Sequence, residues 1–190
     1  MKNVLLIVDP QNDFIEGGAL PVTGGTKALD NLIEFYADHK DLFEQVFVTM
    51  DTHPENHCSF KDNGGEWPPH CVDSTSGWEV YKPLRESLIN DSYFLKGTDP
   101  KEDEYSIFSK NCKDGKELIT ILDNLSYEAH TDLNIYIAGI AGDYCVLNTI
   151  KDLIRLHYGE NLIVLTNCIA SIDGGDELSN CILENNLKTL

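Results

Sequence analysis

The stretch Leu133-Asn134-Ile135-Tyr136-Ile137-Ala138-Gly139-Ile140-Ala141-Gly142-Asp143-Tyr144-Cys145 decides the fold of this chain. Its first eight residues form an apolar run with β-branched side chains, a composition that predicts a buried strand. Residues 143–157 then have helical spacing, so the strand is expected to lead directly into a helix. A strand that passes into a helix in this way is the repeating unit of a parallel sheet.

The same alternation of strand and helix continues through the rest of the chain. Strands are expected at residues 4–8, 46–50, 133–140 and 162–166. Helices are expected near residues 26–39, 115–125, 143–157 and 175–187. We therefore predict one domain over residues 1–190, with a three-layer α/β/α fold and a mostly parallel central sheet. Residues 54–109 are irregular and contain several Gly and Pro residues, which favours long functional loops.

The composition excludes several classes of function. The 190-residue chain is 42% hydrophobic and 24% charged, which is enough for one sizeable core and is unlike a disordered chain. Its net charge of −18 opposes binding to nucleic acid or to an anionic membrane, and a small neutral or cationic substrate fits better. The N-terminal apolar run is too short to span a membrane, so neither export nor an anchor is expected. Six dispersed cysteines are typical of reduced thiols in a cytoplasmic protein.

The segment that follows the second predicted strand has the composition of a metal site. Its candidate ligands are Asp51, His53, His57 and His70. Imidazole and carboxylate groups together suit zinc, iron or manganese, and this set leaves coordination positions open for water or substrate. We therefore expect one divalent metal ion per chain, with zinc in first place and iron or manganese as alternatives.

Reactive side chains also stand where predicted strands end. Asp9 ends the first strand, and Cys145 begins the helix that follows residues 133–140. The carboxyl ends of parallel strands form the edge of the sheet where ligands bind. The helix dipole is expected to lower the pKa of the Cys145 thiol and to favour a thiolate nucleophile, for which Asp9 is the candidate base. Lys96, after the short apolar run at 93–95, is the candidate cation that keeps Asp9 charged.

Four segments of the sequence carry a resemblance to a known family. They are Val8-Asp9-Pro10-Gln11-Asn12-Asp13-Phe14, residues 51–70, Lys96 and residues 139–146. They resemble the nicotinamidases of the isochorismatase-like cysteine hydrolase superfamily. The resemblance implies a catalytic triad of Asp9, Lys96 and Cys145, and a metal held by the four ligands named above. It also implies hydrolysis of nicotinamide to nicotinate and ammonia through a thioester, in NAD salvage, with pyrazinamide as an analogue.

The resemblance further implies how the substrate is held. Phe14, Trp67 and Tyr105 would line an aromatic pocket. The backbone amides of Ala141 and Cys145 would form the oxyanion hole, with a cis peptide bond between Ile140 and Ala141.

The chain departs from the family pattern in two places. Gly142 stands where Thr is usual. Residues 186–190 are expected to end the last helix without the usual closing strand.

Two other functions remain open at this point. One is hydrolysis of another small amide by an isochorismatase-like enzyme, although isochorismatases usually lack both the thiol and the histidine set. The other is a catalytically silent protein that binds a metal or a ligand, in which Lys96 and Asp9 would have no purpose. The sequence does not determine the oligomeric state, and a homo-oligomer is left open.

The remaining reactive side chains have simpler explanations. Cys71 is expected to serve in packing, since free cysteine is among the most buried residue types. The same expectation holds for Cys58, Cys112, Cys168 and Cys181. His130 and His157 are expected near helix ends, where a cation is a routine stabiliser.

Overall fold

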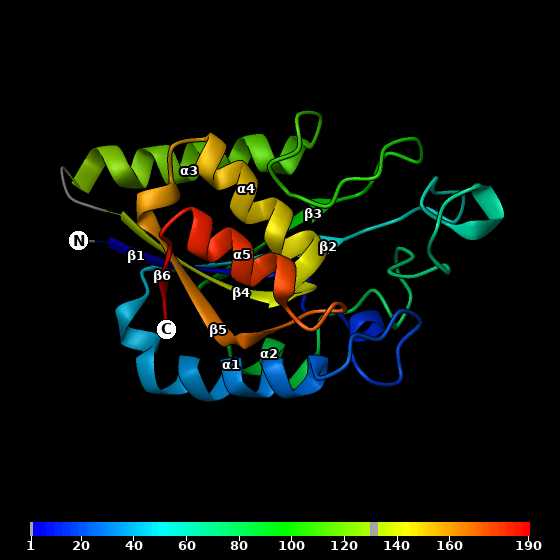
Figure 1. Ribbon diagram of the computed structural model, residues 1–190, viewed down its shortest axis with the longest axis horizontal. Coiled ribbons are helices and arrows are strands. Elements are labelled where there is room, and N and C mark those ends of the chain that lie inside the picture. The colour runs from blue at the N-terminus through cyan, green and yellow to red at the C-terminus, as the bar shows by residue number, and fades with distance from the viewer. Residues whose placement is uncertain (1, 130–132) are drawn as a thin grey trace.

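A computed structural model describes residues 2–129 and 133–190, and within them a six-stranded sheet forms the centre of the protein (Figure 1). The strand order is β3-β2-β1-β4-β5-β6, and every neighbouring pair is parallel. The strands are β1 (Lys2–Val8), β2 (Gln45–Asp51), β3 (Asp91–Lys96), β4 (Leu133–Ile140), β5 (Leu162–Ala170) and β6 (Lys188–Thr189). The predicted parallel sheet is therefore confirmed. His130 lies outside the described residues.

Helices cover both faces of the sheet and build the three predicted layers (Figure 1). One face carries α1 (Gly25–His39) and α2 (Lys82–Ser87). The other face carries α3 (Lys113–Ala129), α4 (Leu147–Arg155) and α5 (Asp176–Glu184). Within residues 2–129 and 133–190, none of these helices combines the length and the apolar character needed to cross a membrane.

Strand β1 shows why the sheet needs a helical layer on each side. Its side chains alternate between the two faces, because successive residues of a strand point in opposite directions. Leu5 and Ile7 pack in the core cluster that contains Leu29 of α1. Leu6 packs in the other cluster, with Leu118 of α3. A central parallel strand is therefore apolar at nearly every position. This continuous run of apolar residues is what predicts the strand from the sequence.

The segment after β4 differs from the prediction in one respect. The expected helix at 143–157 begins as a π-helical turn, Gly142–Val146, and becomes the α-helix α4 only at Leu147. Cys145 therefore lies inside this turn and not at the first position of an α-helix. The π turn widens the helix where the candidate nucleophile stands, a distortion that is frequent at functional sites.

The expectation that the chain ends without a closing strand was wrong. The last helix, α5, ends at Glu184, and the following residues form the short edge strand β6. Residues 188 and 189 pair with Ile163 and Val164 of β5, and the Leu190 N–H donates to the Val164 carbonyl at 2.9 Å. Two residues of strand carry no recognisable apolar alternation, so only the pairing with β5 reveals this element.

The carboxyl ends of the strands bring the candidate site residues to one edge of the sheet. Asp9 follows β1, while Asp51 ends β2 and Lys96 ends β3. The parallel register pairs Asp51 directly with Lys96. Long loops extend beyond this edge, and the N-terminus lies at the opposite end of the molecule (Figure 1).

Glu16 makes hydrogen bonds at the start of α1. One carboxylate oxygen accepts the N–H of Gly24 at 2.8 Å, and the other accepts the N–H of Thr26 at 2.9 Å and the Thr26 hydroxyl. These hydrogen bonds, led by that of the Thr26 side chain, lower the pKa of Glu16 to about 2. The carboxylate thus satisfies N–H groups that a helix start leaves unpaired.

We predict that Glu16→Gln destabilises the protein by about 1 kcal/mol or less at neutral pH, because the carboxylate is exposed and screened. The pKa is depressed in the folded state, so the stabilisation is complete above the ordinary glutamate pKa of 4.5 and is lost as the pH falls towards about 2. Urea unfolding at a series of pH values measures this difference. Glu34→Gln, which removes an exposed carboxylate of the same helix away from its first turn, is the control and is expected to leave the stability at neutral pH nearly unchanged.

Candidate active site

Asp9, Lys96 and Cys145 come together at the edge of the sheet. The Lys96 ammonium lies 2.9 Å from Asp9 Oδ2 and 3.6 Å from Cys145 Sγ. All three side chains are buried. Asp9 has a left-handed backbone conformation with φ of 46°, which residues other than glycine rarely adopt. This turn at the end of β1 is a local strain of the kind that clusters at functional sites.

Lys96 also contacts a second carboxylate. Its ammonium donates to Asp51 Oδ1 at 2.9 Å and to the Glu104 carbonyl at 3.2 Å. The lysine is only 1% exposed, so its charge depends on these partners rather than on water. The two acidic groups raise the pKa of Lys96 well above its usual range, although burial opposes this. The lysine is therefore a cation that contacts both Asp9 and Cys145 on one side and Asp51 on the other.

The two carboxylates around Lys96 are not equivalent. Burial raises the pKa of Asp9, and the nearby Lys96 only partly offsets it. The pKa of Asp51 is held well below its usual range, because Lys96 and His53 together outweigh the effect of burial. Asp51 is thus the carboxylate that stays charged, and Asp9 is the one suited to taking up and returning a proton.

The expected depression of the Cys145 pKa was wrong. Burial raises the pKa of the Cys145 thiol well above its usual range, even though Lys96 lowers it. The charge of a nearby Asp9 carboxylate raises it further. Desolvation of the sulfur outweighs the helix-end effect inferred from sequence and favours the neutral thiol.

Asp51, His53 and His70 form a group that fits a metal ion. One ligand atom from each lies within 4.8 Å of the others, and all three residues are buried. His53 Nε2 is 3.0 Å and His70 Nε2 is 3.7 Å from the same oxygen of Asp51.

The second nitrogen of each ring supports this fit. His53 Nδ1 bonds the Gly97 carbonyl at 2.9 Å, and His70 Nδ1 bonds the Pro68 carbonyl at 2.8 Å. A carbonyl only accepts, so each Nδ1 donates a proton to it, and each Nε2 is the ring atom turned towards Asp51 that would bind a cation.

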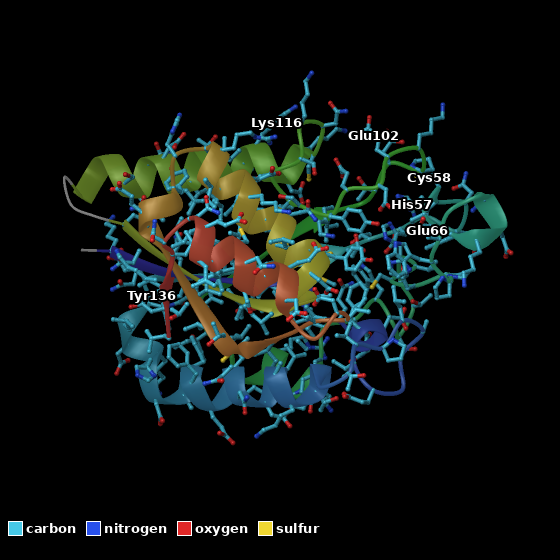
Figure 2. The ribbon with its side chains drawn as sticks, in the orientation of Figure 1. His57, Cys58, Glu66, Glu102, Lys116 and Tyr136 are labelled. Carbon is cyan, nitrogen blue, oxygen red and sulfur yellow. The ribbon has the colours of Figure 1, made fainter. Side chains whose placement is uncertain are left out.

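His57, expected as the fourth ligand, does not join this group. Its ring stacks on the ring of His53 with centroids 3.9 Å apart. Its Nδ1 lies 2.7 Å from Ser59 Oγ, and its Nε2 lies 3.0 Å from the Glu102 carbonyl. Figure 2 shows His57 and Glu102 in the loops beyond the sheet. Both nitrogens are thus engaged by neighbouring loop residues, which spacing in the sequence does not reveal.

A pocket beside the thiol contains the three predicted aromatic residues. Phe14, Trp67 and Tyr105 line it together with Cys145. The Trp67 indole N–H donates to the Tyr105 hydroxyl at 3.1 Å and so fixes both rings. The residues that the sequence analysis missed in this lining are Leu20, Val22, Asp103, Tyr144 and Ile172. Tyr144 meets Trp67 edge to face at 5.1 Å; its position directly before Cys145 was the signal that could have found it.

The backbone beside Cys145 has the features that the resemblance implied. Ala141 lines the pocket, and the peptide bond between Ile140 and Ala141 is cis. The structure also explains Gly142 in place of the usual Thr. A Cβ at this position would lie 2.1 Å from Ser171 Oγ and 2.8 Å from Ile169 Cγ2, so a side chain there would require Ser171 and Ile169 to move.

Two further residues support the site without having been predicted to do so. Gln11 accepts the Asp51 N–H at 2.7 Å and donates to the Asp51 carbonyl at 2.8 Å. Thr49 donates its hydroxyl to Asp9 Oδ1 at 2.7 Å. Gln11 stands in the same opening motif as Asp9, which was a usable signal, whereas Thr49 looks like any other residue of a buried strand.

Comparison with known proteins agrees with this arrangement. The family model described as Isochorismatase domain matches residues 3–180, and the chain therefore belongs to the isochorismatase family. The chain is 34% identical over 174 residues to the nicotinamidase of Escherichia coli (strain K12), an alignment that covers 84% of this chain and 79% of that relative.

Solved structures place the chain more narrowly within the family. The pyrazinamidase of Pyrococcus horikoshii in complex with zinc has a TM-score of 0.84 and 30% identity, covering 100% of this chain and 99% of that chain. PnC1 from L. infantum in complex with nicotinate has a TM-score of 0.82 and 29% identity, covering 100% and 92%. The chain thus groups with nicotinamidases and pyrazinamidases, which are amide hydrolases.

We predict that Gly97→Ala damages the metal group. Gly97 has φ of 68°, and a Cβ there would lie 2.6 Å from His53 Cε1 and 2.8 Å from Asp51 Oδ1. The substitution is expected to cost about 2 kcal/mol of stability or more and to weaken zinc binding. Urea unfolding and a zinc competition titration measure the two effects.

Gly24→Ala is the matched control for this substitution. Gly24 has a similar φ of 80°, but a Cβ there would meet nothing within 4 Å. This variant is expected to lose stability from backbone strain alone. Equal zinc affinity in the two variants would contradict the prediction.

Proposed function

We propose that this protein is a metal-dependent nicotinamidase, which hydrolyses nicotinamide to nicotinate and ammonia through a thioester. One observation carries the proposal: the Asp9, Lys96 and Cys145 cluster and the Asp51, His53 and His70 group open on the same aromatic pocket. The nicotinamidase of Escherichia coli and the nicotinate complex of the L. infantum protein support this substrate.

In this proposal the pocket selects a flat, neutral, aromatic amide. The substrate ring lies against Phe14 and Trp67, with Tyr105 beside them, and the carboxamide faces Cys145. Pyrazinamide keeps the ring nitrogen and the carboxamide, so it fits the same pocket. The acidic surface of the protein favours a neutral substrate over an anion.

Asp51, His53 and His70 would hold one divalent ion, with zinc first and iron or manganese as alternatives. A bound ion supplies a Lewis-acid position for the ring nitrogen of the substrate. The zinc complex of the Pyrococcus horikoshii pyrazinamidase supports zinc. His57 as a fourth ligand is a separate proposal, since it requires the His57 ring to leave Ser59 and the Glu102 carbonyl.

Acylation begins with a proton transfer. Asp9 takes the proton of the Cys145 thiol, and the sulfur attacks the carboxamide carbon. The backbone amides of Ala141 and Cys145 hold the oxyanion that forms, an interaction often worth about 3 kcal/mol per donor. Asp9 then returns the proton to the departing ammonia. The raised pKa of Asp9 suits both halves of this exchange.

Deacylation uses the same groups again. Asp9 removes a proton from water, the water oxygen attacks the thioester carbon, and the bond to the Cys145 sulfur breaks as nicotinate forms. Asp9 then returns its proton to the sulfur, which regenerates the thiol and the carboxylate. Lys96 stays charged throughout and keeps Asp9 and the sulfur in register, 2.9 and 3.6 Å from its ammonium. We place this reaction in NAD salvage, in the cytoplasm, and in one catalytic domain that spans residues 1–190.

Replacing the nucleophile tests the reaction. Cys145→Ala is expected to lower ammonia release from nicotinamide by roughly 10⁴-fold or more, because no thioester can form. The bound metal is expected to remain, since Cys145 is not in the ligand group. Ammonia release and metal content are measured on the same purified samples.

The control for this experiment is Cys168→Ala, which removes a buried thiol from β5, away from the pocket. It is expected to keep most of the activity. Turnover by Cys145→Ala well above background would disprove the nucleophile. Release from another small amide, dependent on Cys145 but absent with nicotinamide, would keep the chemistry and change the substrate.

Replacing single histidines tests the ligand set. His70→Ala is expected to weaken zinc binding by more than about 100-fold, because it removes a ligand. His57→Ala is expected to weaken it by about tenfold if His57 only supports the His53 ring. Competition with a chromophoric chelator measures both constants, and an equal loss in the two variants would make His57 a ligand.

A further inference from the structure

Glu104 is a buried carboxylate that the proposed reaction does not use. It is 7% exposed in a chain whose other carboxylates mostly lie at the surface. Burial raises its pKa, although a hydrogen bond from the Gly97 N–H lowers it. A carboxylate is seldom placed in such a position without a partner that depends on it. Its contacts show which groups those are.

The Glu104 side chain completes the edge of the sheet. Among residues 2–129 and 133–190, β3 pairs only with β2, and no described strand lies along its other edge. Two carboxylates take the place of that strand: Asp114 accepts the Leu95 N–H at 2.7 Å, and Glu104 accepts the Gly97 N–H at 3.0 Å. N–H groups two residues apart point to the same edge, so the two contacts are equivalent in kind.

The two contacts differ in what lies on the other side of the strand. Gly97 uses its carbonyl to accept the His53 Nδ1–H at 2.9 Å, which fixes the orientation of that ring. The Gly97 N–H is thus bonded to Glu104, and the Gly97 carbonyl is bonded to His53. The close approach of Gly97 to His53 and Asp51 leaves little freedom to adjust if the nitrogen side is released.

Glu104 also reaches the central cation. Its own carbonyl accepts the Lys96 ammonium at 3.2 Å. Glu104 therefore touches both residues at the end of β3, Lys96 through its backbone and Gly97 through its side chain. A shift of the Glu104 segment would move the cation of the triad and the support of a metal ligand together.

We propose that Glu104 is a positioning residue that holds the Lys96–Gly97 end of β3 and, through the Gly97 carbonyl, orients His53 for the metal. The proposal rests on the metal site of the proposed function. It assigns Glu104 no contact with substrate and no proton transfer. Residues that orient metal-binding histidines from outside the ligand set typically change metal affinity by about 10–100-fold when they are replaced.

The test measures zinc affinity of the full chain by competition with a chromophoric chelator, without substrate. Glu104→Ala is expected to weaken zinc binding by about 10–100-fold. Glu104→Gln keeps an acceptor oxygen at the same reach and is expected to bind zinc nearly as the unmutated protein does. Glu104→Asp keeps the charge but shortens the side chain, and is expected to weaken binding as Glu104→Ala does.

Asp114→Ala is the matched control. It removes the same kind of contact from the same strand, two residues earlier, where the Leu95 carbonyl accepts the Cys112 thiol and the Gly97 carbonyl is the one that accepts His53. Urea unfolding is measured for every variant. Asp114→Ala is expected to lose stability with zinc affinity unchanged, which separates edge closure from positioning.

Several outcomes would overturn the proposal. One is unchanged zinc affinity in Glu104→Ala or, if that variant does not fold, in Glu104→Asp. A second is a loss of zinc affinity in Asp114→Ala as large as that in Glu104→Ala. A third is a loss of zinc affinity in Glu104→Gln while Glu104→Asp is unaffected, which would make charge the cause. Because no substrate is present, absence of nicotinamide turnover in the unmutated protein would refute the proposed function and leave this result standing.

Discussion

A single buried ammonium group holds this site together. Lys96 lies between Asp9 and Asp51 at 2.9 Å from each, and the charge is almost completely removed from water. A buried charge is tolerable only when its partners are close and well oriented. Three strands, β1, β2 and β3, must therefore end at the same level. The parallel register that pairs Asp51 with Lys96 provides this, so the fold and the site impose the same geometry.

The balance of charge around Lys96 links the proposed chemistry to the proposed metal. Asp9 and Asp51 place two carboxyl groups against one lysine, in an interior that screens charge poorly. A divalent cation beside Asp51 would offset that excess. The same burial raises the pKa of both Cys145 and Asp9. The two shifts favour the proposed transfer of the thiol proton to Asp9 over a preformed thiolate.

Much of this arrangement could be predicted from sequence because the decisive signals are local. Apolar runs mark the strands, and Asp9, Asp51, Lys96 and Cys145 stand within a residue or a turn of their ends. In a parallel sheet those ends meet at one edge, so residues far apart in the chain were expected together. The catalytic and metal-binding roles of these side chains are our proposal, and the variants described above test them.

The sequence by itself determined the alternation of strand and helix, the parallel sheet and the residues that stand at its edge, since each depends on neighbours along the chain. Tertiary structure decided the rest. Groups distant in sequence decide whether His57 faces a metal or its own loop. They also decide whether residues 188 and 189 pair as a strand, and how far burial raises the pKa of Cys145. Glu104 belongs with these, because a carboxylate acquires its partners only when the chain has folded around it.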